Sequence, residues 1–176
     1  MNYYQSTITT LIGDLFTISS EKGICLLLFE DDPSLEYEIK KQFKEIEIVH
    51  DRNYHIKNLN KEFDNYFSGN LKTFQTPLDA NGTDFQCKVW TEIKMIPYGE
   101  TSSYKIISDD LNHPKSIRAI GRANGANKIL FLIPCHRVIG SDGKLIGYRG
   151  GLQRKQWLLD FEKRISGNEK EPMLFG

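Results

Sequence analysis

The segment Thr101–Asn124, TSSYKIISDDLNHPKSIRAIGRAN, decides how we interpret the fold. Its first part carries apolar residues at the spacing of a short helix, which Thr101 or Ser102 can cap. Asn112-His113-Pro114 breaks this helix, and residues 115–124 are predicted to form a second one. Two helices joined by so short a break predict a helix-turn-helix, a motif whose second helix can enter a groove of DNA.

The second predicted helix has two different faces. Ile117 and Ile120 lie one turn apart and are expected to face the core. Arg118 and Arg122 share another face, which can meet DNA. Most of the other positions are small, namely Ser116, Ala119, Gly121, Ala123 and Gly125. Small side chains allow close approach either to a nucleic-acid backbone or to another helix, and the sequence leaves both open.

The charge distribution favours a polyanion as partner. The chain of 176 residues has a formal net charge of zero. Residues 1–87 hold 8 basic and 14 acidic side chains, whereas residues 88–166 hold 14 basic and 7 acidic ones. A basic half is typical of proteins that neutralise phosphates, although two oppositely charged domains that attract each other would give the same pattern.

Composition indicates a folded protein with one good core or two small ones, since 39% of the residues are apolar and 26% are charged. No apolar run approaches the roughly 20 residues of a membrane helix, and the first ten residues do not resemble a leader, so we expect a cytoplasmic protein. Cys25, Cys87 and Cys135 are too scattered for a disulfide framework. No cysteine or histidine has metal-ligand spacing, so we predict no metal.

The first half predicts a small structural α/β domain over residues 1–82. Strands are expected over 14–20 and 23–30 as a hairpin of an antiparallel sheet, and helices over 33–43 and 53–67. Residues 72–78 could return to the sheet, and 79–82 form a plausible linker.

The second half predicts a mainly α, winged helix-turn-helix domain over residues 83–176. Thr83 to Gln86 form a capping box that opens a helix, which ends at Pro97-Tyr98-Gly99. Residues 137–148 predict a strand, an Asp-Gly turn and a return strand, which would be the wing. The last helix carries an apolar stripe with Glu162 at its border, where a glutamate is usually solvated.

Cys135 and His136 are adjacent in the sequence and follow an apolar run. A thiol is nucleophilic only as thiolate, and an adjacent imidazole can take its proton, so the pair suggests covalent chemistry on sulfur. The alternative is a buried structural cysteine, which is common for this residue type.

The run Phe85–Glu162 resembles the O6-alkylguanine-DNA alkyltransferases. The motifs that carry the resemblance are Val89-Trp90, Ile96-Pro97-Tyr98-Gly99-Glu100-Thr101-Ser102-Ser103-Tyr104, Arg118-Ala119-Ile120-Gly121, Ile133-Pro134-Cys135-His136-Arg137-Val138-Ile139 and Gly147-Tyr148-Arg149-Gly150-Gly151-Leu152. The resemblance implies repair of O6-methylguanine, and less efficiently of O4-methylthymine, by irreversible transfer of the alkyl group to Cys135. It implies a monomer that binds duplex DNA through the minor groove, flips the damaged base and needs no cofactor.

The resemblance also implies the catalytic residues. His136 would deprotonate Cys135 through a water, and Glu162 would orient and charge His136. Tyr104 would donate a proton to the guanine ring as it leaves. Arg118 would enter the duplex in place of the flipped nucleotide.

Further positions follow from the same resemblance. Contacts to DNA are expected from Arg118, Arg122, Ser116, Gly121 and Asn127, and Asn127 would also tie the second helix to the cysteine loop. Tyr148, Arg149 and Val138 are expected at the substrate pocket. Two positions depart from the family pattern, because Arg149 replaces a frequent serine and Lys128 a frequent proline.

Three other functions remain as alternatives. A winged-helix regulator would explain the basic half but gives no reason for the Cys135–His136 pair. A non-catalytic sensor of alkylated DNA would lack the reactive cysteine. A cysteine hydrolase would turn over repeatedly, whereas a self-alkylating protein stops after one event.

Overall fold

The computed structural model describes residues 2–114 and 116–167, and its contacts divide the chain into two units. The first unit contains the chain up to Gly82 together with Lys128–Leu132, and the second contains Thr83–Asn127 and the chain from Ile133 on. The predicted second domain ran without interruption over 83–176, whereas the structure assigns the short segment 128–132 within it to the first unit.

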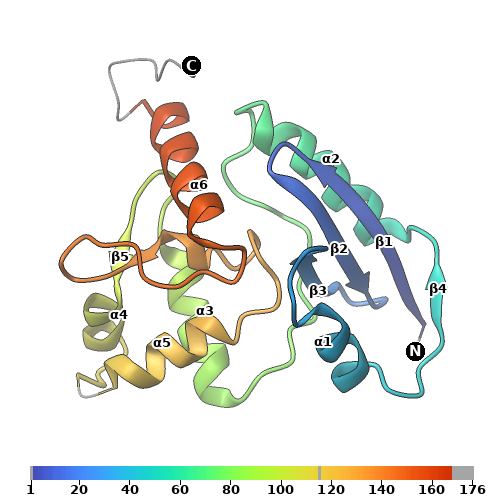
Figure 1. The fold of residues 1–176 in the computed structure, drawn as a ribbon, viewed down its shortest axis with the longest axis horizontal. Helices are drawn as coiled ribbons and strands as arrows, with labels where there is room; N and C mark the ends of the chain where they lie inside the picture. Colours follow the sequence, from blue (N-terminus) through green and yellow to red (C-terminus); the bar gives the residue numbers. More distant parts are fainter. Residues whose placement is uncertain (1, 115, 168–176) are drawn as a thin grey trace. The chain divides into compact units, whose positions relative to one another are not determined.

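The first unit contains a four-stranded sheet in the order β3-β2-β1-β4 (Figure 1). Its strands are β1 (Tyr3–Thr10), β2 (Gly13–Ser19), β3 (Ile24–Phe29) and β4 (Ile48–His50). The predicted hairpin of β2 and β3 is confirmed. The sheet is mixed and not purely antiparallel, because β4 pairs with β1 in parallel.

Two sequence expectations for this sheet were incomplete. Strand β1 was missed because most of its residues are polar and half-exposed, and only Ile8 is buried, so no alternation marks it. The expected strand over 72–78 is reduced to a single bridge between Leu78 and Ile24.

The helices of this unit are α1 (Leu35–Gln42) and α2 (Tyr54–Phe67), as predicted to within two residues. Asn53 caps α2, since its side chain accepts a hydrogen bond from the backbone N–H of Ile56. Helix α2 lies along the sheet (Figure 1) and buries Ile56, Leu59 and Phe63.

The inserted segment 128–132 belongs to the first unit for two reasons. Its backbone pairs with Leu27 of β3, which donates to the Lys128 carbonyl at 2.8 Å and accepts from the Leu130 N–H at 3.0 Å. Phe131 packs against aromatic rings of this unit, with its ring centroid 5.0 Å from that of Phe63. Phe131 has a φ of 66°, a conformation that a bulky residue adopts only when its surroundings impose it.

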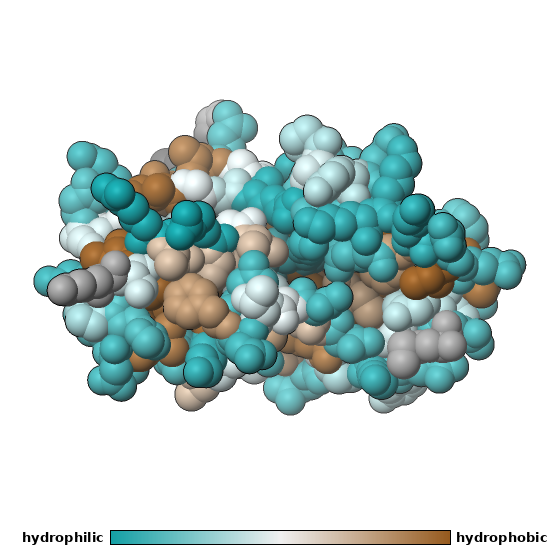
Figure 2. All heavy atoms as spheres, turned by 90° about the horizontal axis from the view of Figure 1, so that it is seen from below, coloured by the Kyte–Doolittle hydropathy of each residue, from teal (hydrophilic) through white to brown (hydrophobic). Residues whose placement is uncertain are grey.

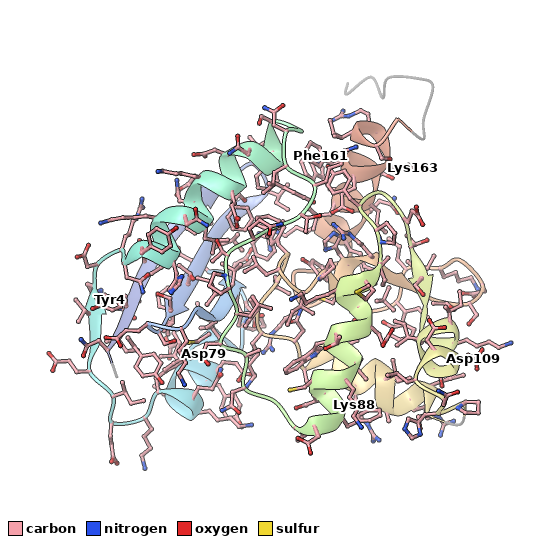
Figure 3. The ribbon with its side chains drawn as sticks, turned by 180° about the vertical axis from the view of Figure 1, so that it is seen from behind. Tyr4, Asp79, Lys88, Asp109, Phe161 and Lys163 are labelled. Carbon is pink, nitrogen blue, oxygen red and sulfur yellow. The ribbon has the colours of Figure 1, made fainter. Side chains whose placement is uncertain are left out.

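The second unit is mainly helical. Its helices are α3 (Asp84–Met95), α4 (Tyr104–Asp110), α5 (Ile117–Gly125) and α6 (Leu152–Ile165), with a 3-10 turn η1 (Cys135–Arg137). The predicted capping box at Thr83 and Gln86 is confirmed. Lys88 on α3 and Asp109 on α4 are exposed (Figure 3).

The helix-turn-helix of α4 and α5 forms with two corrections. Ser103 caps α4, not Thr101 or Ser102, because its hydroxyl accepts from the N–H of Ile106. Ile120 is fully buried as expected, but Ile117 is 42% exposed and does not face the core. Ile117 stands in the first turn of α5, where it lines an open cavity instead.

The predicted hairpin over 137–148 is wrong in its pairing. Strand β6 (Val138–Ile139) pairs in parallel with β5 (Ser102–Ser103). In the described chain no return strand follows, and residues 140–144 form a turn closed by the Gly140 N–H and the Lys144 carbonyl. The carbonyls of Ile146 and Gly147 bind a buried lysine side chain and are therefore not used in a ladder.

Within the described residues, no helix is long and apolar enough to cross a membrane. The face drawn in Figure 2 is largely hydrophilic, with apolar side chains in separate patches.

Candidate active site

Cys135 lies in the wall of an open cavity of the second unit, although only 3% of the residue is exposed. It begins the turn η1, directly after a buried apolar run. The side-chain amide of Asn127 donates to Cys135 Sγ at 3.2 Å and to the Ile133 carbonyl at 2.9 Å. Asn127 therefore fixes both the sulfur and the backbone that precedes it.

The surroundings of Cys135 keep its sulfur protonated at rest. Burial raises the pKa of the thiol, and this effect outweighs the hydrogen bond from Asn127 and the positive charges of Lys155 and Arg149, which act in the opposite direction. Attack by this sulfur therefore requires a base that removes its proton.

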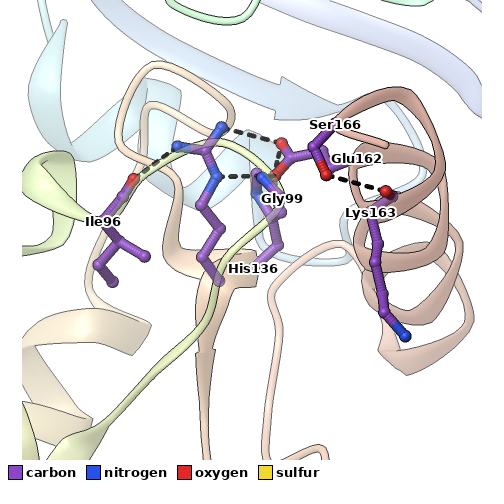
Figure 4. A network of polar contacts seen from close by, with 7 residues as sticks. Ile96, Gly99, His136, Glu162, Lys163 and Ser166 are labelled. Atoms are coloured by element: carbon purple, nitrogen blue, oxygen red, sulfur yellow. Dashed lines mark hydrogen bonds and ion pairs between the residues drawn. The ribbon is translucent and has the colours of Figure 1, made fainter. Parts of the chain in front are cut away.

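His136, Glu162 and Arg137 form a buried polar network (Figure 4). His136 Nε2 lies 2.9 Å from Glu162 Oε1. Arg137 donates from Nε to Oε2 of Glu162 at 2.8 Å and from Nη2 to Oε1 at 2.9 Å. Gly99 adds its backbone N–H to Oε2 at 3.2 Å. Glu162 is completely buried, so the expectation of a solvated border residue is wrong.

The charges in this network prepare His136 to accept a proton. Burial alone would raise the pKa of Glu162, but His136 and Arg137 hold it well below its usual range, so the carboxylate is ionised. Burial lowers the pKa of His136, with Glu162 opposing this shift, so the imidazole is neutral at pH 7. Nε2 carries the hydrogen that faces the carboxylate, and the lone pair for an incoming proton is then on Nδ1.

The cavity has a volume of about 670 Å³ and combines an apolar wall with cationic side chains. Its lining residues come from α4, α5, Cys135 and the segment before α6: Tyr104, Ile117, Arg118, Gly121, Arg122, Asn124, Gly125, Cys135, Ile146, Gly147, Tyr148 and Arg149. Three arginines and no carboxylate occur among these residues. A cavity of this kind favours an anionic ligand that also has an apolar part.

Two tyrosines stand at this cavity. Tyr104 donates its hydroxyl proton to the Ile146 carbonyl at 3.3 Å. Tyr148 has its ring centroid 6.2 Å from that of His136, and its hydroxyl is buried with no hydrogen-bond partner among the described residues. Burial and the nearby Cys135 raise the pKa of both phenols, so both are protonated and able to donate.

Sequence reasoning missed Lys155, which is fully buried on α6. Its ammonium donates to the carbonyls of Val138 at 2.6 Å, Ile146 at 2.9 Å and Gly147 at 3.0 Å, and thereby holds the loop beside the cavity. Burial lowers the pKa of Lys155 to about 8, with Cys135 opposing. The available signal was its position three residues before Leu158, on the apolar stripe, where a lysine needs buried partners.

Seven of the twelve predicted site residues line the cavity: Cys135, Tyr104, Tyr148, Arg149 and the α5 residues Arg118, Gly121 and Arg122. The other five are His136, Glu162, Ser116, Asn127 and Val138. Of these, His136 and Glu162 bind each other, and Asn127 binds the Cys135 sulfur. Asn127 is completely buried, so its place is in the cysteine loop and not against DNA. Val138 is also buried and contributes its backbone carbonyl to Lys155. Ser116 is half-buried just before α5.

No group of three or more potential metal ligands occurs in the described part of the chain.

Two family models match the chain. Residues 3–80 match the ribonuclease-like domain of 6-O-methylguanine DNA methyltransferase, and residues 84–164 match its DNA binding domain. A methylated-DNA–protein-cysteine methyltransferase of Methanosarcina barkeri is 41% identical over 166 residues, which cover 91% of this chain and 97% of that relative. The chain belongs to the 6-O-methylguanine DNA methyltransferase family.

Other comparisons agree with this family. The inducible methylated-DNA–protein-cysteine methyltransferase of Bacillus subtilis is 49% identical over 111 residues. That match covers 63% of this chain and 62% of the relative, so the chain spans less than two thirds of that relative's length. The crystal structure of Mycobacterium tuberculosis OGT in complex with DNA has a TM-score of 0.81 and 37% identity, and the match covers 94% of both chains. The expected α/β domain followed by a DNA-binding domain of this family is therefore confirmed.

Proposed function

We propose that this protein repairs alkylated DNA directly, by moving the methyl group of O6-methylguanine to Sγ of its own Cys135. O4-methylthymine is the slower substrate. The observation that carries the proposal is the position of Cys135, a thiol in a cavity wall, next to a buried His136–Glu162 pair. Family membership and the relatives' names, which are those of methylated-DNA–protein-cysteine methyltransferases, support it.

The reaction is a displacement at the methyl carbon. The proton of Cys135 passes through a water to Nδ1 of His136, and the negative charge on Glu162 stabilises the imidazolium that results. The sulfur then attacks the methyl carbon, a C–S bond forms, and the bond between carbon and O6 breaks. The electron pair of the broken bond stays with the guanine, which takes a proton from the Tyr104 hydroxyl.

The products of the reaction limit each protein molecule to one methyl transfer. Solvent returns a proton to Tyr104 and accepts the one on His136, so the net products are guanine and S-methylcysteine. The thioether cannot form a thiolate, and freeing the sulfur would require its C–S bond to break with the cysteine thiolate as leaving group, so the protein acts once. Only a thiol and proton carriers are needed, and we therefore propose no cofactor and no metal.

DNA is the proposed partner because the cavity mouth carries cations on one exposed helix face. Arg118 and Arg122 are exposed on α5, four residues apart, and can pair with phosphates. Gly121 lies between them in the sequence and adds no side chain to the cavity. Because Cys135 is almost completely buried, the damaged base has to leave the duplex to reach it.

The finer arrangement follows from the same surface. We propose that α5 enters the minor groove, that Arg118 fills the gap of the flipped nucleotide, and that Ser116 contacts the backbone beside it. Residues 1–82 act as the structural domain and residues 83–176 as the catalytic one. The protein acts as a monomer in the cytoplasm, where three scattered cysteines are expected to stay thiols.

Mass spectrometry tests the proposal directly. The protein is incubated with duplex DNA carrying one O6-methylguanine, and the intact mass and the peptides are measured. We expect one methyl group on the Cys135 peptide, saturating at one per molecule, and none on Cys87 or Cys25. Tight binding without a mass change would overturn the proposal in favour of a sensor, and repeated turnover with an unmodified thiol in favour of a hydrolase.

Two variants separate binding from transfer. Cys135→Ser should abolish methyl transfer and retain affinity for duplex DNA. Arg118→Ala should slow repair of the duplex more than attack on free O6-benzylguanine, because only the duplex needs its base flipped. Equal losses on both substrates would remove the proposed role of Arg118.

A further inference from the structure

Asn124 is a buried residue of the cavity wall that the proposed chemistry does not use. It lies in the last turn of α5 and is 5% exposed. It lines the same cavity as Cys135 and Tyr104. Its side-chain Nδ2 donates to the Tyr104 hydroxyl oxygen at 3.4 Å.

This hydrogen bond determines where the Tyr104 proton can go. A phenol has one proton, and an oxygen that accepts from Asn124 has to direct that proton elsewhere. In this structure the proton goes to the Ile146 carbonyl at 3.3 Å. Both contacts are long for hydrogen bonds to a hydroxyl, so an incoming base can replace the Ile146 carbonyl as the acceptor.

The Ile146 carbonyl does not depend on Tyr104. It already accepts from the Lys155 ammonium at 2.9 Å, which is the shorter of its two contacts. When Tyr104 turns its proton to a base, this carbonyl therefore stays satisfied. The loop and the proton donor are held by different side chains.

The orientation of the Asn124 amide matters for the same reason. If the amide were turned by half a rotation, Oδ1 would face the phenol and take its proton. In the observed orientation Oδ1 is buried and has no hydrogen-bond partner among the described residues. Nδ2 is the atom that donates to the Tyr104 hydroxyl. This hydrogen bond lowers the pKa of Tyr104, whereas burial and Cys135 raise it.

We propose that Asn124 is a positioning residue that directs the Tyr104 proton towards the departing base. The inference rests on the proposed function, because it concerns the step in which Tyr104 protonates guanine. In the proposed step Asn124 touches neither the methyl group nor the thiol. It acts only through the phenol oxygen.

A double-mutant cycle tests this dependence. The variants are Asn124→Leu, Tyr104→Phe and the two together, and the single-turnover rate of methyl transfer from duplex DNA is measured for each. We expect Tyr104→Phe to slow transfer by about 100-fold and Asn124→Leu by about tenfold. The double variant should be no slower than Tyr104→Phe within about twofold. Losses that multiply would overturn the proposal.

Alkylation of Cys135 by iodoacetamide provides the control. This reaction needs the thiolate but has no base to protonate, so Asn124→Leu should leave its rate unchanged. A slower reaction would show that Asn124 acts on the thiol or on folding, and it would also overturn the proposal.

Asn124→Asp gives a pH signature that a structural role does not produce. The carboxylate introduced by this substitution would accept the Tyr104 proton and turn it away from the base, so transfer should be slower than in Asn124→Leu at about pH 8, where a carboxyl group is ionised. Transfer should recover as the pH falls and the carboxylate is protonated. A rate ratio to the wild type that does not change with pH would contradict the proposal.

Failure of this inference can be told apart from failure of the proposed function. If the wild-type protein does not methylate Cys135, the proposed function fails. If it does methylate Cys135 and the two losses multiply, only the role of Asn124 fails.

Discussion

Arg137 binds both carboxylate oxygens of Glu162, and His136 shares one of them. The carboxylate that supports the histidine is therefore also the partner of a buried guanidinium. Glu162 has two functions as a result. It stabilises the charge that His136 gains, and it keeps Arg137 neutralised inside the unit.

Replacing Glu162 by Gln should destabilise the protein strongly. Arg137 would remain buried without its anionic partner, and loss of one member of a buried pair costs about 3–5 kcal/mol. Urea unfolding measures this change. The matched control is Glu36→Gln, in an exposed pair with Lys40, which should leave the unfolding midpoint in place. Equal shifts for the two variants would contradict the structural role of Glu162.

Replacing Asn127 by Ala should make Cys135 less reactive. The variant loses the hydrogen bonds to Sγ and to the Ile133 carbonyl, so the thiol pKa rises further and its pH profile moves to higher pH. The measurement is the rate of iodoacetamide alkylation of the Cys135 peptide against pH. Cys87 is exposed and serves as the reference thiol in the same molecule. An unchanged profile for Cys135 would show that Asn127 does not act on the sulfur.

Replacing Lys155 by Met should loosen the loop beside the cavity. The variant keeps most of the side-chain volume but loses three donors to the carbonyls of Val138, Ile146 and Gly147. One hydrogen bond to a charged group contributes about 1.5–3 kcal/mol, so amide exchange in residues 140–148 should accelerate by about tenfold or more. Methyl transfer should slow with it. Unchanged exchange would mean that the ammonium does not hold this loop.

Replacing Gly99 by Ala should damage the network around Glu162. Gly99 has a φ of 79°, and a Cβ there would lie 2.5 Å from Ser166 Oγ and 3.1 Å from the Glu162 carbonyl. Gly143→Ala is the matched control, since its φ is 78° and nothing lies within 4 Å of the added carbon. Both variants strain the backbone by about 1–2 kcal/mol, but only Gly99→Ala should lose more than that and slow transfer. Equal unfolding free energies for the two variants would exclude the steric effect.

Local sequence patterns predicted some of the site residues and some of their contacts. The residues themselves pointed to the Cys135–His136 pair, whereas the roles of Tyr104 and Glu162 came only from the family resemblance. The structure places Cys135 and Tyr104 at one cavity and His136 against Glu162. The helix-turn-helix followed from apolar spacing and a proline break, which are local properties. By contrast, two predictions were wrong: that Ile117 faces the core, and that a return strand follows the turn at 140–144. Such contacts depend on neighbouring elements of the fold.

The sequence by itself determined the helices, the capping box at Thr83 and the candidate nucleophile, since these depend on residues a few positions apart. Tertiary structure alone decided three features. Strand β1 and the inserted segment 128–132 find their hydrogen bonds on other strands, and for 128–132 the partner is distant in sequence. Glu162 meets Arg137 and His136 across 25 and 26 positions of sequence. The partners of the buried charges of Lys155 and Arg137 cannot be identified from local sequence, because only the fold brings to them the groups that make a charge stable inside the protein.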